Sequence, residues 1–319
     1  MSHQKTLIIS HSDNDEVDAV SEFLDETNYF VLITDEIHSR YRFSVLPNER
    51  SFSIVDEHKK ITIHSSELAS IWVASTKHIY NEGFDNDDDL AVFNSREYLS
   101  LIDALIVIAE ENGCCIVNHP SVTNHAGDKI RQQLVAMRHG LKVPDQLITN
   151  RKETFASAAF AKRAIFKPIH SSNLHSNPTD GELYMAKPVV ITEQIYAGIC
   201  SGKLEVGVPH FQEKLEKITE YRVVVFDGKV YAFNITGEYG FDWRGYMPNI
   251  DFEPVKKFSM AKGCLTFVKE LGIKLAAFDF METADGMYFI ECNPPGYFVF
   301  CDPENNTGMI SDFAKYLLS

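Results

Sequence analysis

Two strand–turn–strand patterns in the last third of the chain constrain its fold most. Each has an Asp-Gly pair, Asp227-Gly228 or Asp285-Gly286, between two stretches rich in apolar residues. An Asp-Gly pair in this setting is a strong sign of an antiparallel hairpin. The hairpin strands are predicted at residues 221–226, 229–235, 274–281 and 287–291, with helices at 256–271 and 308–318. The last third should therefore form an antiparallel sheet with helices packed on it.

The earlier part of the chain alternates short strands and helices, which is typical of an α/β fold. Polar residues Ser12–Asp15 precede a helix that should end near Asp25, and Gly140 should end a helix that begins near Ala126. The other strands are predicted at 6–10, 30–34, 52–55, 61–64, 71–74, 115–118 and 164–168, with helices at 99–110 and 154–160. An edge strand or extended link is predicted at 141–144 and 147–149, and an irregular loop at 170–187. Residues 189–194 and 211–215 bracket a polar stretch with several glycines.

Length and composition set the class of protein. The chain has 319 residues, 45% of them hydrophobic, which is typical of a globular protein with about two or three subdomains. Its 30 Lys and Arg against 45 Asp and Glu give a net charge of −15, which disfavours a general nucleic-acid binder but permits a local basic pocket. The six cysteines form no CxxC pair, and no segment has the apolar length of a signal-peptide core or a membrane span. We therefore expect a cytoplasmic protein with reduced thiols and neither nucleic-acid nor membrane partners.

Three common phosphate-binding or metal-binding motifs are excluded, because the chain lacks a required residue or spacing in each. Gly240 and Gly245 have the spacing of a Walker loop, but Tyr246 stands where that loop needs lysine. The acidic run Asp85–Asp89 lacks the Gly and Glu of a calcium loop. The histidines have no zinc-ligand spacing, so we expect loop positions for His170, His175 and His210.

Three oxygen-bearing side chains fall near the strand ends of the second hairpin. Asp279 is on its first strand, and Glu291 and Asn293, two residues apart, share a face of the returning strand. A turn at Asp285-Gly286 would bring Asp279 opposite Glu291. Two carboxylates and an amide suit Mg²⁺, which typically bridges substrate phosphates. The other interpretation of this spacing is a set of polar residues at strand ends beside a turn.

Several motifs occur in the order found in ATP-grasp ligases. Phe211–Leu215 resembles their hinge, Glu220-Tyr221-Arg222 their D/E-x-R strand, and Asp279…Glu291-Cys292-Asn293 their metal triad. Asp128-Lys129 at a helix start and Phe166-Lys167-Pro168 at a strand end resemble the sites of their two phosphate-binding lysines. The resemblance implies an ATP-grasp fold.

A second set of motifs resembles one branch of that family, the graspetide synthetases, which cross-link ribosomally made peptides in the manner of microviridin maturation. The set consists of Val117-Asn118, Asp242-Trp243-Arg244, and residues 293–300 followed by 307–310. It implies a pre-ATP-grasp domain at residues 1–116, a central subdomain at 117–188 and a C-terminal antiparallel-sheet subdomain at 189–319. The chain departs from the branch at Ala74 and Ser75, where a V-W-x-R-R pattern would have arginines. The segment between Arg244 and the helix predicted from residue 256 is also short.

The resemblance also implies a role for each candidate residue. Mg²⁺ would be held by Asp279, Glu291 and Asn293, and the phosphates of ATP by Lys129 and Lys167. The residues implied to bind the rest of ATP are Gln212, Glu213, Lys214, Leu215 and Glu220. The candidates for stabilising an acyl phosphate or docking a substrate carboxylate are Arg222 and Arg244, since guanidinium binds either group in a bidentate manner.

The implied reaction is an ATP-dependent cross-linking of a precursor peptide, leader plus core. A Glu or Asp side chain is phosphorylated, and a Thr or Ser hydroxyl or a Lys amine then attacks it, so that an ester or amide closes a macrocycle. The implied assembly is a homodimer. Two other interpretations stay open: a ligase that adds an amino acid or glutamate to a small molecule or protein terminus, and a non-catalytic module that binds ATP or peptide. The complete lysine and metal sets disfavour the second.

Overall fold

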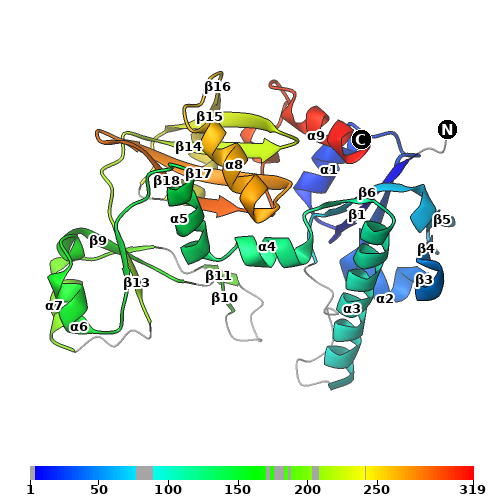
Figure 1. Ribbon diagram of the computed structural model, residues 1–319, viewed down its shortest axis with the longest axis horizontal. Helices are drawn as coiled ribbons and strands as arrows, with labels where there is room; N and C mark the ends of the chain where they lie inside the picture. The colour runs from blue at the N-terminus through cyan, green and yellow to red at the C-terminus, as the bar shows by residue number, and fades with distance from the viewer. Residues whose placement is uncertain are drawn as a thin grey trace.

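The computed structural model describes residues 4–76, 89–169, 173–175, 183–185, 188–202, 208–240 and 242–319. An N-terminal sheet with its helices, a large antiparallel sheet and a small antiparallel sheet follow one another along its long axis (Figure 1). The N-terminal sheet is parallel and the others are antiparallel, which agrees with the predicted α/β to α+β class. The division of the chain at residues 116 and 188 stays a prediction.

The N-terminal sheet has the strand order β2-β1-β6-β7. Its elements are β1 (Lys5–Ser10), α1 (Asp15–Ser21), β2 (Tyr29–Ile33), α2 (Ile37–Arg40), β6 (Leu68–Val73), α3 (Asp89–Glu111) and β7 (Cys115–Val117). A second sheet beside it contains β3 (Tyr41–Leu46), β4 (Ser51–Asp56) and β5 (Ile61–His64). Asn14 caps α1 by accepting a hydrogen bond from the N–H of Glu16, as the polar cluster before this helix predicted. The sequence did not predict β3, and it began α3 at residue 99 instead of Asp89.

The connection to the rest of the chain consists of two short helices, α4 (Pro120–Ala126) and α5 (Lys129–Arg138). The prediction of one helix from residue 126 is therefore wrong at its start. Gly127 ends α4, and the Asp128 side chain accepts a hydrogen bond from the N–H of Arg131, which makes Asp128 the N-cap of α5. This cap makes Lys129 the first residue of α5.

The small sheet is antiparallel, with the order β12-β9-β13-β8. Its elements are β8 (Gln146–Ile148), α6 (Lys152–Ser157), β9 (Ala164–Lys167), β12 (Val189–Val190), α7 (Glu193–Cys200) and β13 (His210–Glu213). Phe155 of α6 stacks on Phe211 of β13, with ring centroids 4.1 Å apart, in the core of this sheet. The chain leaves β12 for α7, whose N-cap is Thr192: its hydroxyl accepts a hydrogen bond from the N–H of Ile195.

Two sequence predictions fall largely outside the described residues. Within the predicted irregular loop 170–187, β10 (Asn173–His175) pairs with β11 (Leu183–Met185) in antiparallel fashion, so these residues, His175 among them, form strands instead. His170 lies outside the described residues. Residues 85–88 of the acidic run do as well, whereas Asp89 begins α3.

The large sheet has the order β16-β15-β14-β17-β18, and both predicted hairpins are present in it. Its strands are β14 (Thr219–Phe226), β15 (Lys229–Gly237), β16 (Ile250–Val255), β17 (Leu275–Thr283) and β18 (Gly286–Asn293). Helices α5 and α8 (Ala261–Leu271) cover one face (Figure 1), where Phe267 packs against Phe278 and Phe289. The helix predicted from residue 256 begins only at Ala261, since the five residues that follow the edge strand β16 are not helical.

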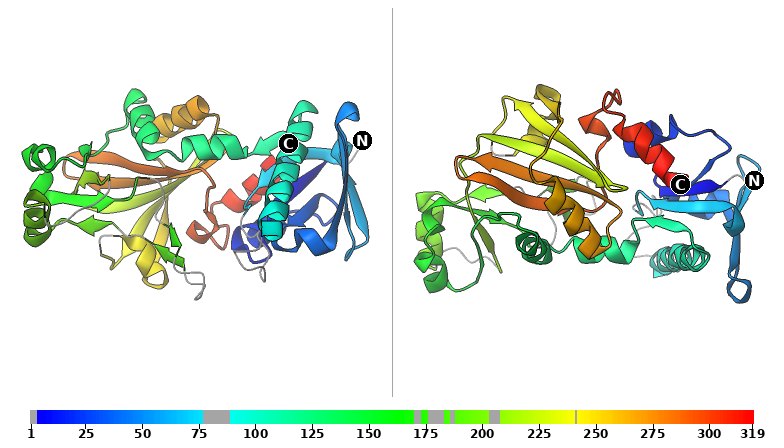
Figure 2. Two further views of the ribbon diagram at one scale, coloured as in Figure 1. Left: turned by 90° about the horizontal axis from the view of Figure 1, so that it is seen from below. Right: turned by 45° about the horizontal axis from the view of Figure 1, so that its top comes forward.

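The C-terminal helix α9 (Met309–Leu317) lies between the N-terminal sheet and the large sheet (Figure 2). Phe313 contacts Trp72 of β6 and Phe226 of β14, with ring centroids 5.1 and 5.2 Å apart. All three side chains are buried, and burying rings of this size stabilises the junction by about 2 kcal/mol each. The N-terminal sheet is therefore fixed to the large sheet by a shared core.

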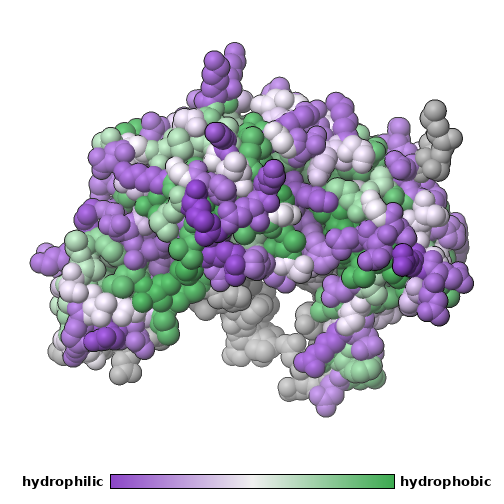
Figure 3. All heavy atoms as spheres, in the orientation of Figure 1, coloured by the Kyte–Doolittle hydropathy of each residue, from purple (hydrophilic) through white to green (hydrophobic). Residues whose placement is uncertain are grey.

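The surface is mixed in character. Hydrophilic side chains cover much of the face drawn in Figure 3, and apolar side chains gather over the small sheet. Among the described residues, no helix combines the length and the apolar character needed to cross a bilayer.

Candidate active site

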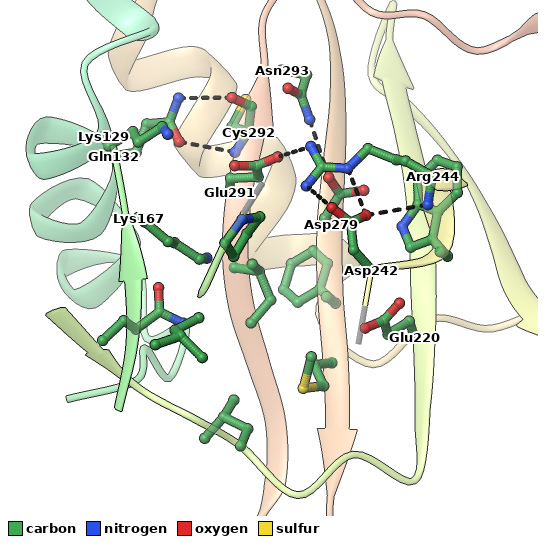
Figure 4. A pocket seen from close by; sticks show the side chains of 18 of the residues that line it. Lys129, Gln132, Lys167, Glu220, Asp242, Arg244, Asp279, Glu291, Cys292 and Asn293 are labelled. Carbon is green, nitrogen blue, oxygen red and sulfur yellow. Dashed lines mark hydrogen bonds and ion pairs between the residues drawn. The ribbon is translucent and has the colours of Figure 1, made fainter. Parts of the chain in front are cut away.

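A cavity of about 870 Å³ lies between the small sheet and the large sheet. Its walls come from α5, β9, β13, β14, β17, β18 and the 3₁₀ segment η5 (Trp243–Asn249) (Figure 4). Most of the predicted site residues line it: Lys129, Lys167, Gln212, Glu213, Leu215, Glu220, Arg244, Asp279, Glu291 and Asn293. Residues far apart in the sequence thus meet at one place.

The carboxylate wall consists of Asp279, Glu291 and Asn293. Asp279 on β17 is the direct cross-strand partner of Glu291 on β18, so the predicted hairpin juxtaposition is confirmed. The Asn293 amide donates a hydrogen bond to Asp279 Oδ2 at 3.2 Å. A bulge follows Asp279, where the pairing of the two strands shifts, and such irregularities redirect side chains next to sites.

Arg222 lies behind this wall and does not line the cavity. Only 4% of it is exposed, and its Nη1 donates to Asp279 Oδ1 at 2.9 Å. Its Nη2 donates to the carbonyl oxygens of Gly296 and Tyr297, each at 2.8 Å. These contacts assign Arg222 to holding Asp279 and the chain after Asn293 in place.

Arg244 reaches across the front of the cavity, as Figure 4 shows. Its Nε and Nη2 donate to the two carboxylate oxygens of Asp242 at 2.8 and 3.0 Å. Its Nη1 lies 3.5 Å from Glu291 Oε1. The same Asp242 caps η5 by accepting from the N–H of Arg244, so one short segment fixes both the backbone and the side chain of this arginine.

The lysine wall consists of Lys129 and Lys167. Lys129 Nζ donates to the carbonyl oxygen of Pro168 at 3.0 Å. Burial lowers the pKa of both ammonium groups, against the opposing charge of Glu291. Burial would raise the pKa of Glu291, but Lys167, Arg244 and Lys129 outweigh it and hold that pKa low, so Glu291 is a carboxylate at neutral pH.

Only part of the segment 212–215, which was predicted to bind the rest of ATP, lines the cavity. Gln212, Glu213 and Leu215 line it, whereas the Lys214 ammonium binds Glu216 Oε1 at 3.1 Å and is not among the cavity residues. Glu213 donates its N–H to the Asp145 carbonyl at 2.8 Å, and its carboxylate forms an ion pair with Arg163.

Glu220 faces the cavity from β14 and is 7% exposed. Burial raises its pKa to about 7, although Lys217 lies 3.5 Å from its Oε1.

Gln132 lines the cavity but was not among the residues predicted from the sequence. Its amide forms a pair of hydrogen bonds with the backbone of Cys292, from Nε2 to the carbonyl at 2.7 Å and from the N–H to Oε1 at 2.9 Å. These bonds fix α5 against β18 beside Glu291 (Figure 4). The spacing held a signal, because Gln132 comes three residues after Lys129 and therefore shares its helix face.

The prediction for His210 is wrong. His210 lies in β13, opposite Lys167 of β9, and is 2% exposed instead of lying in a loop. Its Nε2 is 2.9 Å from Gln146 Oε1. Burial, together with the nearby Lys167 and Lys129, lowers its pKa to about 4, so the imidazole is neutral at physiological pH.

The carboxylate wall suits a hard divalent cation. Glu291 stays charged, and Asp279 and Asn293 add a carboxylate and an amide oxygen next to it. In the part of the chain that the structure describes, no three His, Cys, Asp or Glu side chains gather to hold a metal. Asn293 is the third oxygen-bearing side chain of this wall.

No protein-family model matches the chain, and no curated protein matches it. Solved structures do. One is the macrocyclase MdnC bound with precursor peptide MdnA, from Microcystis aeruginosa MRC, at 18% identity and a TM-score of 0.80, covering 99% of each chain. Another is a RiPP-associated ATP-grasp ligase from Chryseobacterium gregarium in complex with ADP and a leader and core peptide, at 20% identity and a TM-score of 0.80, covering 98% of this chain and 96% of that one.

A third is the ATP-grasp ligase PsnB complexed with a phosphomimetic variant of its minimal precursor, Mg and ADP. It has 20% identity and a TM-score of 0.73, with 99% of each chain covered. Because the match extends over nearly the whole of each chain, the N-terminal sheet, the large sheet and the small sheet are all shared. The resemblance predicted from the motifs is therefore confirmed in three dimensions, and the chain has the fold of these ATP-grasp ligases and of the macrocyclase MdnC.

Proposed function

We propose that this protein is an ADP-forming ligase that activates side-chain carboxylates of a ribosomally made precursor peptide and joins them to hydroxyl or amino groups of the same peptide. One observation carries the proposal: Asp279 and Glu291 face each other in register on one wall of a cavity, and Lys129 and Lys167 lie on the other. A nucleoside triphosphate with a divalent cation has the charges that would match these two walls.

Each wall has a role in binding the substrate ATP. Lys129 and Lys167 would neutralise phosphate oxygens, while Gln212, Glu213 and Leu215, at and just after the end of β13, would contact adenine and Glu220 would contact the ribose. Mg²⁺, held by Asp279, Glu291 and Asn293, would supply the charge that draws electrons from the transferring phosphoryl group. We leave Lys214 out of this set, because its ammonium binds Glu216.

The reaction then has two steps. An oxygen of the peptide carboxylate attacks the γ-phosphorus, the bond to the β-phosphate oxygen breaks, and ADP leaves. The hydroxyl or amine attacks the acyl carbon of the resulting acyl phosphate, and its proton passes to the departing phosphate, which leaves as hydrogen phosphate while the ester or amide forms. Arg244 would stabilise the negative charge on both the carboxylate and the acyl phosphate, because Asp242 holds its guanidinium at the cavity front.

The peptide substrate is supported by the fold. MdnC was solved with its precursor peptide, and the Chryseobacterium ligase with a leader and a core peptide. An acidic core would meet a net charge of −15, so that recognition must depend on specific contacts rather than on bulk attraction. The homodimer stays a prediction.

The test uses the full chain, ATP, Mg²⁺ and a short peptide with an acidic core encoded beside the gene. We expect ADP release and the loss of one water mass per cross-link, and in the presence of hydroxylamine we expect a peptide hydroxamate, because hydroxylamine captures acyl phosphates. Asp279→Asn should reduce all three signals strongly. Circular dichroism checks that this variant keeps its fold, because the buried Arg222 loses its charged partner.

The alternatives give different results. A gain of mass with added glutamate or another amino acid would identify a ligase that extends its substrate. Bound nucleotide without ADP release and without hydroxamate would identify a binding module. Either result would contradict the cross-linking proposal.

A further inference from the structure

The six residues after Asn293, Pro294–Val299, form a loop that we call the ligand loop. Its backbone is strained: Gly296 has a φ of 99° and Tyr297 a φ of 51°, in the region that residues with a side chain rarely adopt. A Cβ at Gly296 would also lie 2.9 Å from Leu275 Cδ2. A loop of this shape needs contacts that hold it, because a residue with a side chain, here Tyr297, is disfavoured in that region.

Two of these contacts come from residues near the site. Arg222 donates to the carbonyl oxygens of Gly296 and Tyr297, and its other arm binds Asp279. Asn118, which follows β7, donates to the carbonyl oxygen of Pro294, and its Oδ1 accepts from the N–H of Leu275 at the start of β17.

The third contact comes from the N-terminal helix α1. Glu16 Oε1 accepts hydrogen bonds from the N–H groups of Phe298 and Val299, at 2.9 and 3.2 Å. Glu16 is 8% exposed, and burial raises its pKa to about 7. A carboxyl group this deeply buried destabilises the fold unless it is hydrogen-bonded, and here its hydrogen bonds go to the ligand loop.

Arg222 and Glu16 thus hold the same loop by its opposite backbone groups. The Arg222 guanidinium donates hydrogen bonds to two successive carbonyl oxygens of the loop. The Glu16 carboxylate accepts hydrogen bonds from the next two N–H groups. The loop begins directly after Asn293, so any movement of it would shift Asn293 against Asp279.

We infer that Glu16 is a positioning residue, through which the N-terminal unit holds the ligand loop and so sets the geometry of Asn293 and Asp279. This rests on the proposed function in one respect, namely that these two residues bind Mg²⁺. Glu16 has no other role in the proposed reaction. Nothing in the sequence around Glu16 indicated that it would contact the ligand loop.

The experiment compares Glu16→Ala, Glu16→Gln and Asp18→Ala. Gln keeps an oxygen that can accept from both N–H groups, and Asp18 is an exposed acid on the same helix, so its loss serves as the matched control. Two quantities are measured: hydrogen exchange at the Phe298 and Val299 amides, and the affinity of the protein for Mg²⁺ in the presence of ADP.

We expect Glu16→Ala to speed exchange at both amides and to weaken Mg²⁺ binding by several-fold. This is less than the about 10- to 100-fold loss usual for an outer-shell contact, because Glu16 binds the loop and not a ligand. ADP binding without Mg²⁺ should change little, because adenine would bind at β13. Glu16→Gln and Asp18→Ala should remain close to the unchanged protein. If Glu16→Ala does not fold, Glu16→Asp, which is one methylene shorter and keeps the charge, should give an intermediate weakening.

Several outcomes would overturn the inference. One is faster amide exchange with unchanged Mg²⁺ affinity, and another is a Glu16→Gln variant as impaired as Glu16→Ala. If the unchanged protein binds Mg²⁺ and ADP but cross-links no peptide, the proposed function fails while the effect of Glu16 remains measurable. A protein that binds neither would contradict both.

Discussion

The two walls of the cavity are built differently. Asp279 and Glu291 are neighbours on one hairpin, and each has an arginine beside it, Arg222 at 2.9 Å and Arg244 at 3.5 Å. Lys129 and Lys167 come from separate elements, a helix start and a strand end. Within the described ranges neither lysine has a carboxylate at ion-pair distance. The carboxylate wall is therefore largely neutralised and fixed by the protein itself, whereas the lysine wall presents positive charge that an anionic ligand would neutralise.

The largest effect should come from Glu291→Gln. This substitution keeps the shape but removes the charge that faces both lysines and Arg244, so that a cation would lose a ligand. We expect turnover to fall by about 10³-fold, measured as ADP release. Glu253→Gln, an exposed acid of β16 in the same sheet, is the matched control and should keep full turnover. Near-normal turnover of Glu291→Gln would remove the carboxylate wall from the mechanism.

A smaller loss is expected from Lys167→Met on the opposite wall. Methionine preserves much of the apolar stem but removes the charge, so phosphate binding should weaken and turnover should fall by about 10²-fold. The Lys167→Met variant should also be more stable than the unchanged protein, because a buried ammonium whose pKa is lowered disfavours folding at neutral pH. Thermal unfolding together with ADP release measures both effects, with the exposed Lys162→Met as the control. A Lys167→Met variant that loses stability would show that the lysine wall is neutralised in the free protein.

The smallest effect concerns Glu220, a carboxylate of the same sheet without an arginine partner among the described residues. Its pKa is about 7 when folded, above the ordinary value of 4.5, so the folded state holds the proton more tightly. Stability should therefore fall as the pH rises between these values. Glu220→Gln has no such proton to lose, and its stability relative to the unchanged protein should rise by about 2 kcal/mol from about pH 5 to about pH 7. Denaturant unfolding across this range measures the difference. A difference that stays constant with pH would mean that Glu220 is as well neutralised as Glu291.

The carboxylate wall could be predicted from the sequence because it is local. An Asp-Gly turn and the two-residue period of a strand are enough to place Asp279 opposite Glu291. The break between α4 and α5 is also local: the Asp128-Lys129 motif indicated a helix start, although the helix itself was predicted to begin near residue 126. His210 was misjudged for a different reason, because only its pairing with β9 shows that the polar segment before it returns to the sheet.

The sequence by itself determined the hairpins and the carboxylate wall, since Asp279 and Asn293 are only 14 positions apart. The two lysines lie farther apart in the chain, and only the order of the motifs indicated them. Only the tertiary structure decided what fixes the walls in space. Gln132 meets Cys292 across 160 residues, and Glu16 meets Phe298 across 282. No period or spacing reports such contacts. They exist because the shared core around α9 and the packing of α5 on the large sheet bring those segments together, and a buried polar group must then find its partner there.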